Sequence, residues 1–133
     1  MKTFLTLLLI FTASVFAACQ SAAPEKAEKA EIKQISVERA SDDTTKENVQ
    51  FIDVRTDSEY KSGHAPKALN MPLDALDGEL AKLDKEKPVY VICQTGRRSQ
   101  TAAETLKKAG FTDVYNITGG TSAWTNANLP LEK

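Results

Sequence analysis

The stretch of residues 89–110 constrains the fold most, because it is typical of a strand, a short loop and a helix in direct succession. Four apolar, strand-forming residues, Val-Tyr-Val-Ile, lead straight into Cys93. A short polar loop with one glycine and two arginines follows, and from Ser99 the sequence favours a helix that ends at Gly110. Cys93 therefore opens a loop that faces a helix N-terminus, where N–H groups and the helix dipole favour negative charge.

The rest of the chain predicts strands and helices in alternation. Apolar runs rich in β-branched and aromatic residues predict strands at 35–37, 49–54, 68–71, 89–92 and 114–117. Capping residues and leucine spacing predict helices at 57–61, 73–83, 99–109 and 122–124, whereas 38–48 is too polar to predict one. Strands so far apart along the chain cannot pair as hairpins, which indicates an α/β fold with a parallel sheet between helical layers.

Length, charge and cysteine count exclude several classes of protein. The chain has 133 residues, enough for one domain, which we expect over residues 32–131. Its net charge of −1 and lack of a basic cluster give no sign of nucleic-acid binding. The two cysteines lie in different contexts, which argues against a disulfide framework, and no second cysteine or histidine cluster indicates a metal site.

The first 31 residues have the composition of a targeting and tether segment. The sequence predicts a secretory signal peptide over residues 1–18 of a bacterial protein, because one lysine is followed by an apolar stretch and then by two small residues. Phe16-Ala17-Ala18-Cys19 resembles the lipobox of bacterial lipoproteins, in which the cysteine carries the lipid. Residues 19–31, rich in Ala, Glu and Lys, would then be a flexible tether to a membrane on the periplasmic side. Cleavage after Ala17 or Ala18, releasing a soluble periplasmic protein, is the alternative.

The loop after Cys93 has the composition of an anion-binding cup. Successive N–H groups can curl around an anion, and Gly96 allows the backbone conformations that such a turn needs. The same positive field, with Arg97 and Arg98, would lower the pKa of Cys93 and make it nucleophilic near neutral pH. The alternative is a buried structural cysteine that only ends a strand.

Several motifs together resemble those of single-domain rhodaneses. They are Asp53-Val54-Arg55 with Glu59-Tyr60, the segment from Gly63-His64 to Met71-Pro72, the loop Cys93-Gln94-Thr95-Gly96-Arg97-Arg98-Ser99, and Gly119-Gly120 with Trp124 and Leu129-Pro130. The resemblance runs from about Val49 to Pro130. It implies a five-stranded parallel sheet in a three-layer α/β/α arrangement. It also implies transfer of a sulfane sulfur from thiosulfate or a similar donor, through a cysteine persulfide, to cyanide or a thiol, by a monomer without a cofactor.

The resemblance implies a role for each matching residue. Cys93 would be the nucleophile and carry the persulfide, which the N–H groups of the loop would hold. The substrate-binding residues would be Gln94, Thr95, Gly96, Arg97, Arg98 and Ser99, with Arg98 the first choice and Arg97 the second for the sulfonate end of thiosulfate. Four further residues would support the loop, namely Asp53, Arg55, Glu59 and His64.

Loop length separates the possible chemistries. Relatives that act on oxyanions, the dual-specificity phosphatases and one class of arsenate reductase, carry an arginine six positions after the cysteine. In this chain Ser99 stands there, and the arginines stand at four and five. The shorter cup favours a sulfurtransferase over a phosphatase or arsenate reductase. A domain that binds persulfide or docks a partner without turnover is the non-enzymatic alternative.

Overall fold

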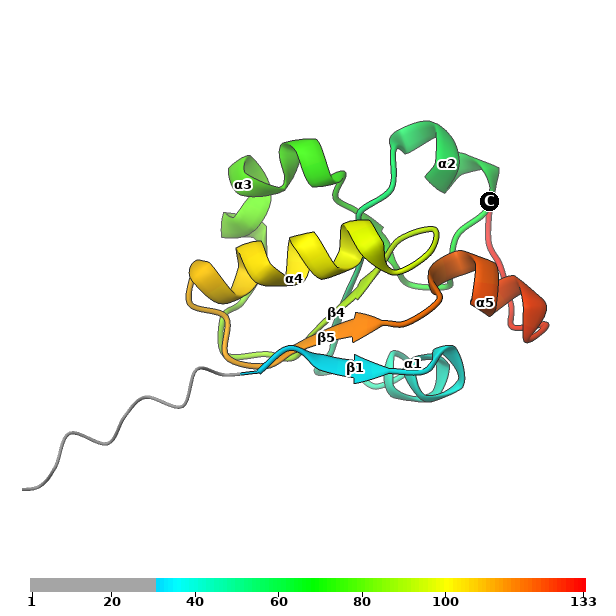
Figure 1. The fold of residues 1–133 in the computed structure, drawn as a ribbon, viewed down its shortest axis with the longest axis horizontal. Coiled ribbons are helices and arrows are strands. Elements are labelled where there is room, and N and C mark those ends of the chain that lie inside the picture. The colour runs from blue at the N-terminus through cyan, green and yellow to red at the C-terminus, as the bar shows by residue number, and fades with distance from the viewer. Residues whose placement is uncertain (1–30) are drawn as a thin grey trace, which may run out of the picture.

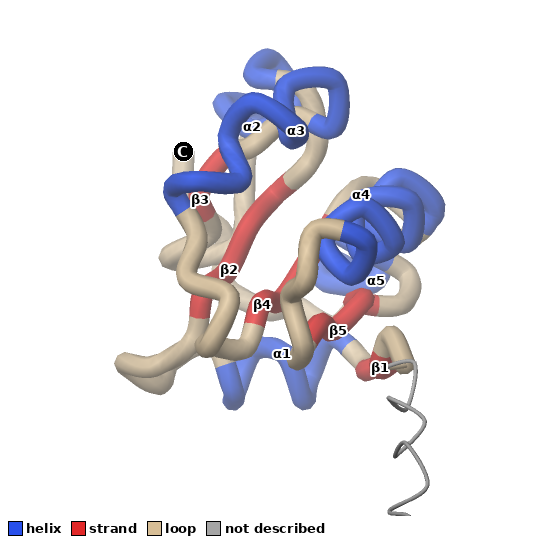
Figure 2. Tube along the Cα trace, turned by 90° about the vertical axis from the view of Figure 1, so that its left-hand side faces the viewer, coloured by secondary structure: helices blue, strands red, loops and turns tan. Residues whose placement is uncertain are grey.

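The sheet has five parallel strands in the order β1-β5-β4-β2-β3; Figure 1 labels the first three of this order, and Figure 2 labels all five. The computed structural model describes residues 31–133, so the predicted signal peptide and Cys19 lie outside the described residues, as does almost all of the predicted tether. The strands are β1 (Lys33–Ile35), β2 (Gln50–Asp53), β3 (Leu69–Asn70), β4 (Val89–Ile92) and β5 (Val114–Ile117). The predicted parallel α/β architecture is confirmed.

Helices cover both faces of this sheet, which gives the three layers (Figure 2). They are α1 (Val37–Asp43), α2 (Asp57–Ser62), α3 (Leu76–Glu79), α4 (Arg97–Lys108) and α5 (Gly120–Asn126). Apolar residues of α3 and α4 pack on one face, and those of α1 and α5 pack on the other. In β4, Val89 and Val91 join the first cluster, while Tyr90 and Ile92 join the second. Both sides of this central strand are therefore buried, as expected of a continuous apolar run in a parallel sheet.

Two predictions at the start of the domain are wrong. The first strand is residues 33–35, and Ser36 is instead the N-cap of a helix over part of the stretch predicted not to be helical. The Ser36 side chain accepts a hydrogen bond from the N–H of Arg39, and Val37 and Ala40 bury the apolar side of the helix. Two buried apolar residues and one N-cap therefore suffice to stabilise this short helix, because the sheet provides the surface on which the helix packs.

The leucine-rich segment is also less regular than its spacing predicts. Residues 73–83 form a 3₁₀ turn (Leu73–Ala75), the four-residue α3 and a second 3₁₀ turn (Leu80–Lys82). All four leucines of the segment still lie against the same core cluster, so the predicted apolar face is correct. The predicted continuous helix is wrong. Gly78, a weak helix former, lies within α3. Helix α4 begins at Arg97, two residues before the predicted start.

Candidate active site

Cys93 lies at the carboxyl edge of the sheet, one residue past the end of β4, as the sequence predicts. Its sulfur accepts a hydrogen bond from the N–H of Gly96 at 3.1 Å and one from the hydroxyl of Ser99 at 3.3 Å. The residue is 1% exposed and is the free cysteine of the described residues. The thiol is thus at the base of a cup whose wall is the loop and the first turn of α4.

The cup favours the thiolate form of Cys93. Burial is the largest single influence and by itself raises the pKa of the thiol. The Ser99 hydroxyl and the N–H groups of Ser99, Thr95 and Gly96 act in the opposite direction. Together they outweigh burial, and the pKa of Cys93 lies below that of an ordinary cysteine. The lowered pKa makes the thiolate, the nucleophilic form of the cysteine, easier to reach.

Helix α5 holds the outer side of the cup. The N–H of Thr121 donates to the carbonyl oxygen of Cys93 at 2.8 Å, and the N–H of Ser122 donates to that of Gln94 at 3.1 Å. These carbonyl oxygens accept their hydrogen bonds from α5, outside the loop. The N–H groups of the loop are therefore free to point at the sulfur of Cys93. Helix α5, almost 30 residues away in the sequence, therefore helps to determine the electrostatic field at the Cys93 sulfur.

Two glycines make this arrangement possible. Gly96, the residue before α4, has a φ of 96°, a left-handed conformation that side chains rarely adopt. Gly120 has a φ of 57°, and a Cβ atom there would collide with the Cys93 carbonyl oxygen and lie 2.6 Å from that of Gln94. From the sequence, Gly119-Gly120 predicts only a tight turn near this edge. The contact between α5 and the loop was missed, because a Gly-Gly pair does not reveal what packs against it.

Arg98 is held by an acidic residue of α2. Its guanidinium donates to both carboxylate oxygens of Glu59, at 2.8 and 2.7 Å. Glu59 also accepts from the backbone N–H and hydroxyl of Thr56, in a capping box at the start of α2. The hydrogen bonds from Arg98 are the largest influence on this carboxylate and lower the pKa of Glu59 to about 2. This ion pair links α2 to the active loop.

Arg97 is arranged differently from Arg98. Its side chain is exposed and forms no ion pair with any residue of the described range 31–133. It lines two surface depressions beside the loop, and Thr95 lines both of them as well. Of the two arginines, Arg97 is thus the one whose charge is available to an anion at this surface.

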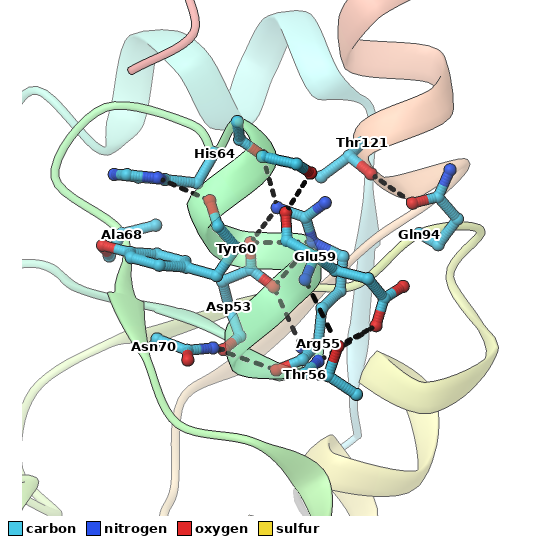
Figure 3. A network of polar contacts seen from close by, with 12 residues as sticks. Asp53, Arg55, Thr56, Glu59, Tyr60, His64, Ala68, Asn70, Gln94 and Thr121 are labelled. Carbon is cyan, nitrogen blue, oxygen red and sulfur yellow. Dashed lines mark hydrogen bonds and ion pairs between the residues drawn. The ribbon is translucent and has the colours of Figure 1, made fainter. Parts of the chain in front are cut away.

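The supporting residues lie next to the loop and are linked to one another by hydrogen bonds, in part through the backbone (Figure 3). Asp53 and Arg55 are a buried pair, joined by hydrogen bonds of 2.7–3.0 Å, and Arg55 also donates to the carbonyl oxygen of Gly63 (Figure 3). His64 stacks on Tyr60, with ring centroids 3.7 Å apart, and its Nδ1 lies 3.0 Å from the Tyr60 carbonyl oxygen. These contacts fix the backbone after β2 and before β3.

No group of three or more His, Cys, Asp or Glu side chains is placed to hold a metal ion in residues 31–133. Within the same range, no helix has the length and apolar composition needed to span a bilayer.

Comparison with known proteins assigns the fold to a family. The thiosulfate sulfurtransferase GlpE of Shewanella oneidensis is 36% identical over 96 residues, which cover 72% of this chain and 95% of GlpE. A GlpE of Coxiella burnetii is 38% identical over 92 residues, covering 69% of this chain and 86% of that protein. A rhodanese-like domain protein from Staphylococcus aureus has a crystal structure that superposes with a TM-score of 0.68 at 31% identity. That match covers 77% of this chain and all of that one. The rhodanese-like domain family itself matches residues 36–127, and the chain belongs to this family.

Proposed function

We propose that the protein is a sulfurtransferase that carries a sulfane sulfur on Cys93 and takes it from thiosulfate or a similar anionic donor. The observation that carries the proposal is the sulfur of Cys93, buried under a Gly96 N–H group and the Ser99 hydroxyl with its pKa lowered. The names of the GlpE relatives, thiosulfate sulfurtransferases, support the same reaction class.

The chemistry requires two displacements at sulfur. The Cys93 thiolate attacks the outer sulfur of thiosulfate, a new S–S bond forms, and the bond to the sulfonate breaks so that sulfite leaves with the electron pair. The persulfide then extends into the cup, where N–H groups stabilise its negative charge as an oxyanion hole does. Cyanide or a thiolate next attacks the outer sulfur and leaves with it, and the electron pair returns to Cys93.

The arginines have separate roles in this proposal. Glu59 already occupies the guanidinium of Arg98, so Arg98 orients the loop. Arg97 attracts the sulfonate end of the donor, because it is the loop arginine without an ion pair in the part of the chain that the structure describes. This assignment reverses the order of preference that the sequence suggests.

The position of Ser99 supports sulfur transfer over phosphate chemistry. The side chain six residues after Cys93 is fully buried and donates its hydroxyl to the sulfur. No guanidinium can reach into the cup from that position to hold a tetrahedral oxyanion. A phosphate-ester assay tests this alternative directly, and turnover of the ester with Cys93 intact would favour it.

The decisive experiment is thiocyanate formation from thiosulfate and cyanide. We expect the purified domain to form thiocyanate and Cys93→Ser to abolish it without loss of the folded state. Mass spectrometry after thiosulfate alone should show one added sulfur on the peptide that contains Cys93. Equal turnover in the variant would exclude the mechanism. A persulfide without turnover would point to a persulfide-binding domain.

We also propose that the domain is attached to a bacterial membrane, on the periplasmic side, through a lipid on Cys19. The support is the sequence alone, a signal-peptide pattern followed by Cys19 and a polar tether. We expect Cys19→Ala to move the protein from the membrane fraction to the soluble fraction. An unchanged distribution would favour cleavage before a soluble periplasmic protein.

A further inference from the structure

A buried amide side chain, that of Asn116, lies in β5 behind the active loop. Its residue is 4% exposed, and the strand is otherwise apolar where it faces the core, since Val114 and Ile117 are fully buried. Asn116 lies on the same face of β5 as Val114, because side chains alternate along a strand, and this face packs on α4. Strands β1 and β5 and helix α4 lie side by side here (Figure 1).

The amide nitrogen of Asn116 has three acceptors around it. Nδ2 lies 2.8 Å from Oε1 of Gln34 in β1 and 3.2 Å from Oε1 of Gln100 in α4. The third acceptor is the carbonyl oxygen of Gly96, at 3.4 Å. Gln34 also donates to Gln100, at 2.8 Å. Asn116 therefore connects the edge strand, the long helix and the active loop.

The oxygen of the same amide is not satisfied. Oδ1 of Asn116 is buried and accepts no hydrogen bond within residues 31–133. A buried acceptor without a donor destabilises the folded state, and an apolar side chain of similar size would avoid this loss. Stability therefore does not explain why an amide lies at this position. Its contact with Gly96 points instead to a role in orienting the loop.

Gly96 is the residue of the loop for which such a contact matters most. Its N–H lies 3.1 Å from the Cys93 sulfur, closer than the Ser99 hydroxyl, and glycine has the least restricted backbone of any residue. Its carbonyl oxygen accepts from the Asn116 amide and, at 3.3 Å, from the N–H of Gln100. These two bonds restrict the conformation of Gly96 and hence the direction of its N–H.

We propose that Asn116 is a positioning residue for Cys93: it holds Gly96 so that the Gly96 N–H points at the sulfur, both in the thiolate and in the persulfide. The hydrogen bonds of Asn116 within the described part of the chain do not reach Cys93, so it acts through Gly96. The effect on turnover rests on the proposed sulfurtransferase activity, whereas the effect on the thiolate does not.

Asn116→Leu tests this role, because it removes the amide and keeps the approximate size of the side chain. Gln34 and Gln100 stay bonded to each other, and the Gly96 carbonyl oxygen keeps the Gln100 N–H. We therefore expect the urea midpoint of unfolding to be unchanged or higher. The thiol pKa of Cys93 should rise by about half a unit to one unit, measured by the pH dependence of alkylation with iodoacetamide.

Turnover should change with the thiol. Below the raised pKa, thiocyanate formation from thiosulfate and cyanide should be about threefold to tenfold slower than in the wild type, and it should recover as the pH rises. A contact that only stabilised the fold would not give this recovery. The variant leaves the charged side chains around the cup unchanged, so the shift reports the backbone donors. These side chains are Arg97, Arg98, Glu59, Asp53 and Arg55.

A second variant and a control complete the test. Asn116→Val, with a smaller, strand-forming side chain, should raise the thiol pKa in the same way. Asn48→Leu, at an exposed asparagine before β2, is the matched control and should change neither the pKa nor turnover. A wild-type thiol pKa in folded Asn116→Leu and Asn116→Val would overturn the positioning role. Absence of thiocyanate formation by the wild-type protein would instead overturn the proposed function, and alkylation would still decide the role of Asn116.

Discussion

Two polar centres lie at the carboxyl edge of the sheet, and they use their hydrogen-bonding groups in opposite ways. After β4, several donors converge on the single sulfur of Cys93. After β2, Asp53 and Arg55 form a buried ion pair at 2.7 Å, with exposed side-chain fractions of 0% and 4%. At Cys93, several hydrogen-bond donors surround an atom that can react. At Asp53 and Arg55, each charge is neutralised by the other inside the protein.

This difference separates a reactive site from a supporting one. A buried pair whose charges are satisfied stabilises one backbone arrangement, and it has little left to offer a ligand. Donors that face one ionisable sulfur instead stabilise whatever negative charge develops there. The two centres should therefore respond differently to substitution, one in stability and the other in thiol chemistry.

The largest expected effect is on stability, at the Asp53–Arg55 pair. Asp53→Ala leaves a buried guanidinium without its counter-ion, and we expect the free energy of unfolding to fall by about 3–5 kcal/mol. Urea denaturation measures this, with Lys61→Ala as the control. That substitution breaks an exposed ion pair with Asp57 and should cost less than about 1 kcal/mol. A large change in the thiol pKa of folded Asp53→Ala would show that the two centres are coupled.

Gly120→Ala should have the next largest effect, this time on the cup. The new methyl group displaces the backbone of Cys93 and Gln94, and we expect kcat/KM for thiosulfate to fall about 100-fold. The thiol pKa should rise, since the N–H groups no longer point at the sulfur. Gly78→Ala is the control, because no heavy atom lies within 4 Å of its added Cβ. Wild-type activity in folded Gly120→Ala would mean that α5 does not position the loop.

Ser99→Ala removes one donor and leaves the backbone cup in place. A hydrogen bond to a charged group contributes about 1.5–3 kcal/mol, so we expect the thiol pKa to rise by about one to two units. Activity should then be lower at neutral pH and recover as the pH rises through the new pKa. The pH dependence of alkylation by iodoacetamide, followed by mass spectrometry, gives this value. Thr101→Ala, an exposed hydroxyl on the same helix, should leave the profile unshifted.

The smallest expected effect is at the Glu59–Arg98 pair. The pKa of Glu59 is lowered to about 2, so its stabilising contribution is present above the ordinary glutamate pKa and is lost as the pH falls through about 2. Both side chains are about one-third exposed, which limits the contribution to about 1 kcal/mol or less. The stability difference between wild type and Glu59→Gln should therefore shrink between pH 5 and pH 2. A difference that grows on acidification would contradict this origin.

Local sequence was sufficient for most of the strands and for the site of the nucleophile. The run before Cys93 predicts β4 because both faces of a central parallel strand are apolar. The cap at Thr56 and the stop at Gly63 correctly predict α2. Helix α1 was missed, because Val37 and Ala40 gain their burial from the sheet and not from neighbours in the chain.

By itself the sequence determined that a cysteine ends a buried strand, and that a short loop with two arginines and a helix follows it. These features depend on residues close together in the chain, which is why their spacing is informative. Only the tertiary structure decided that Glu59 holds Arg98 and leaves Arg97 exposed, and that α5 bonds the carbonyl oxygens of Cys93 and Gln94. Such contacts join residues tens of positions apart, and they arise when parallel strands bring their carboxyl ends to one edge.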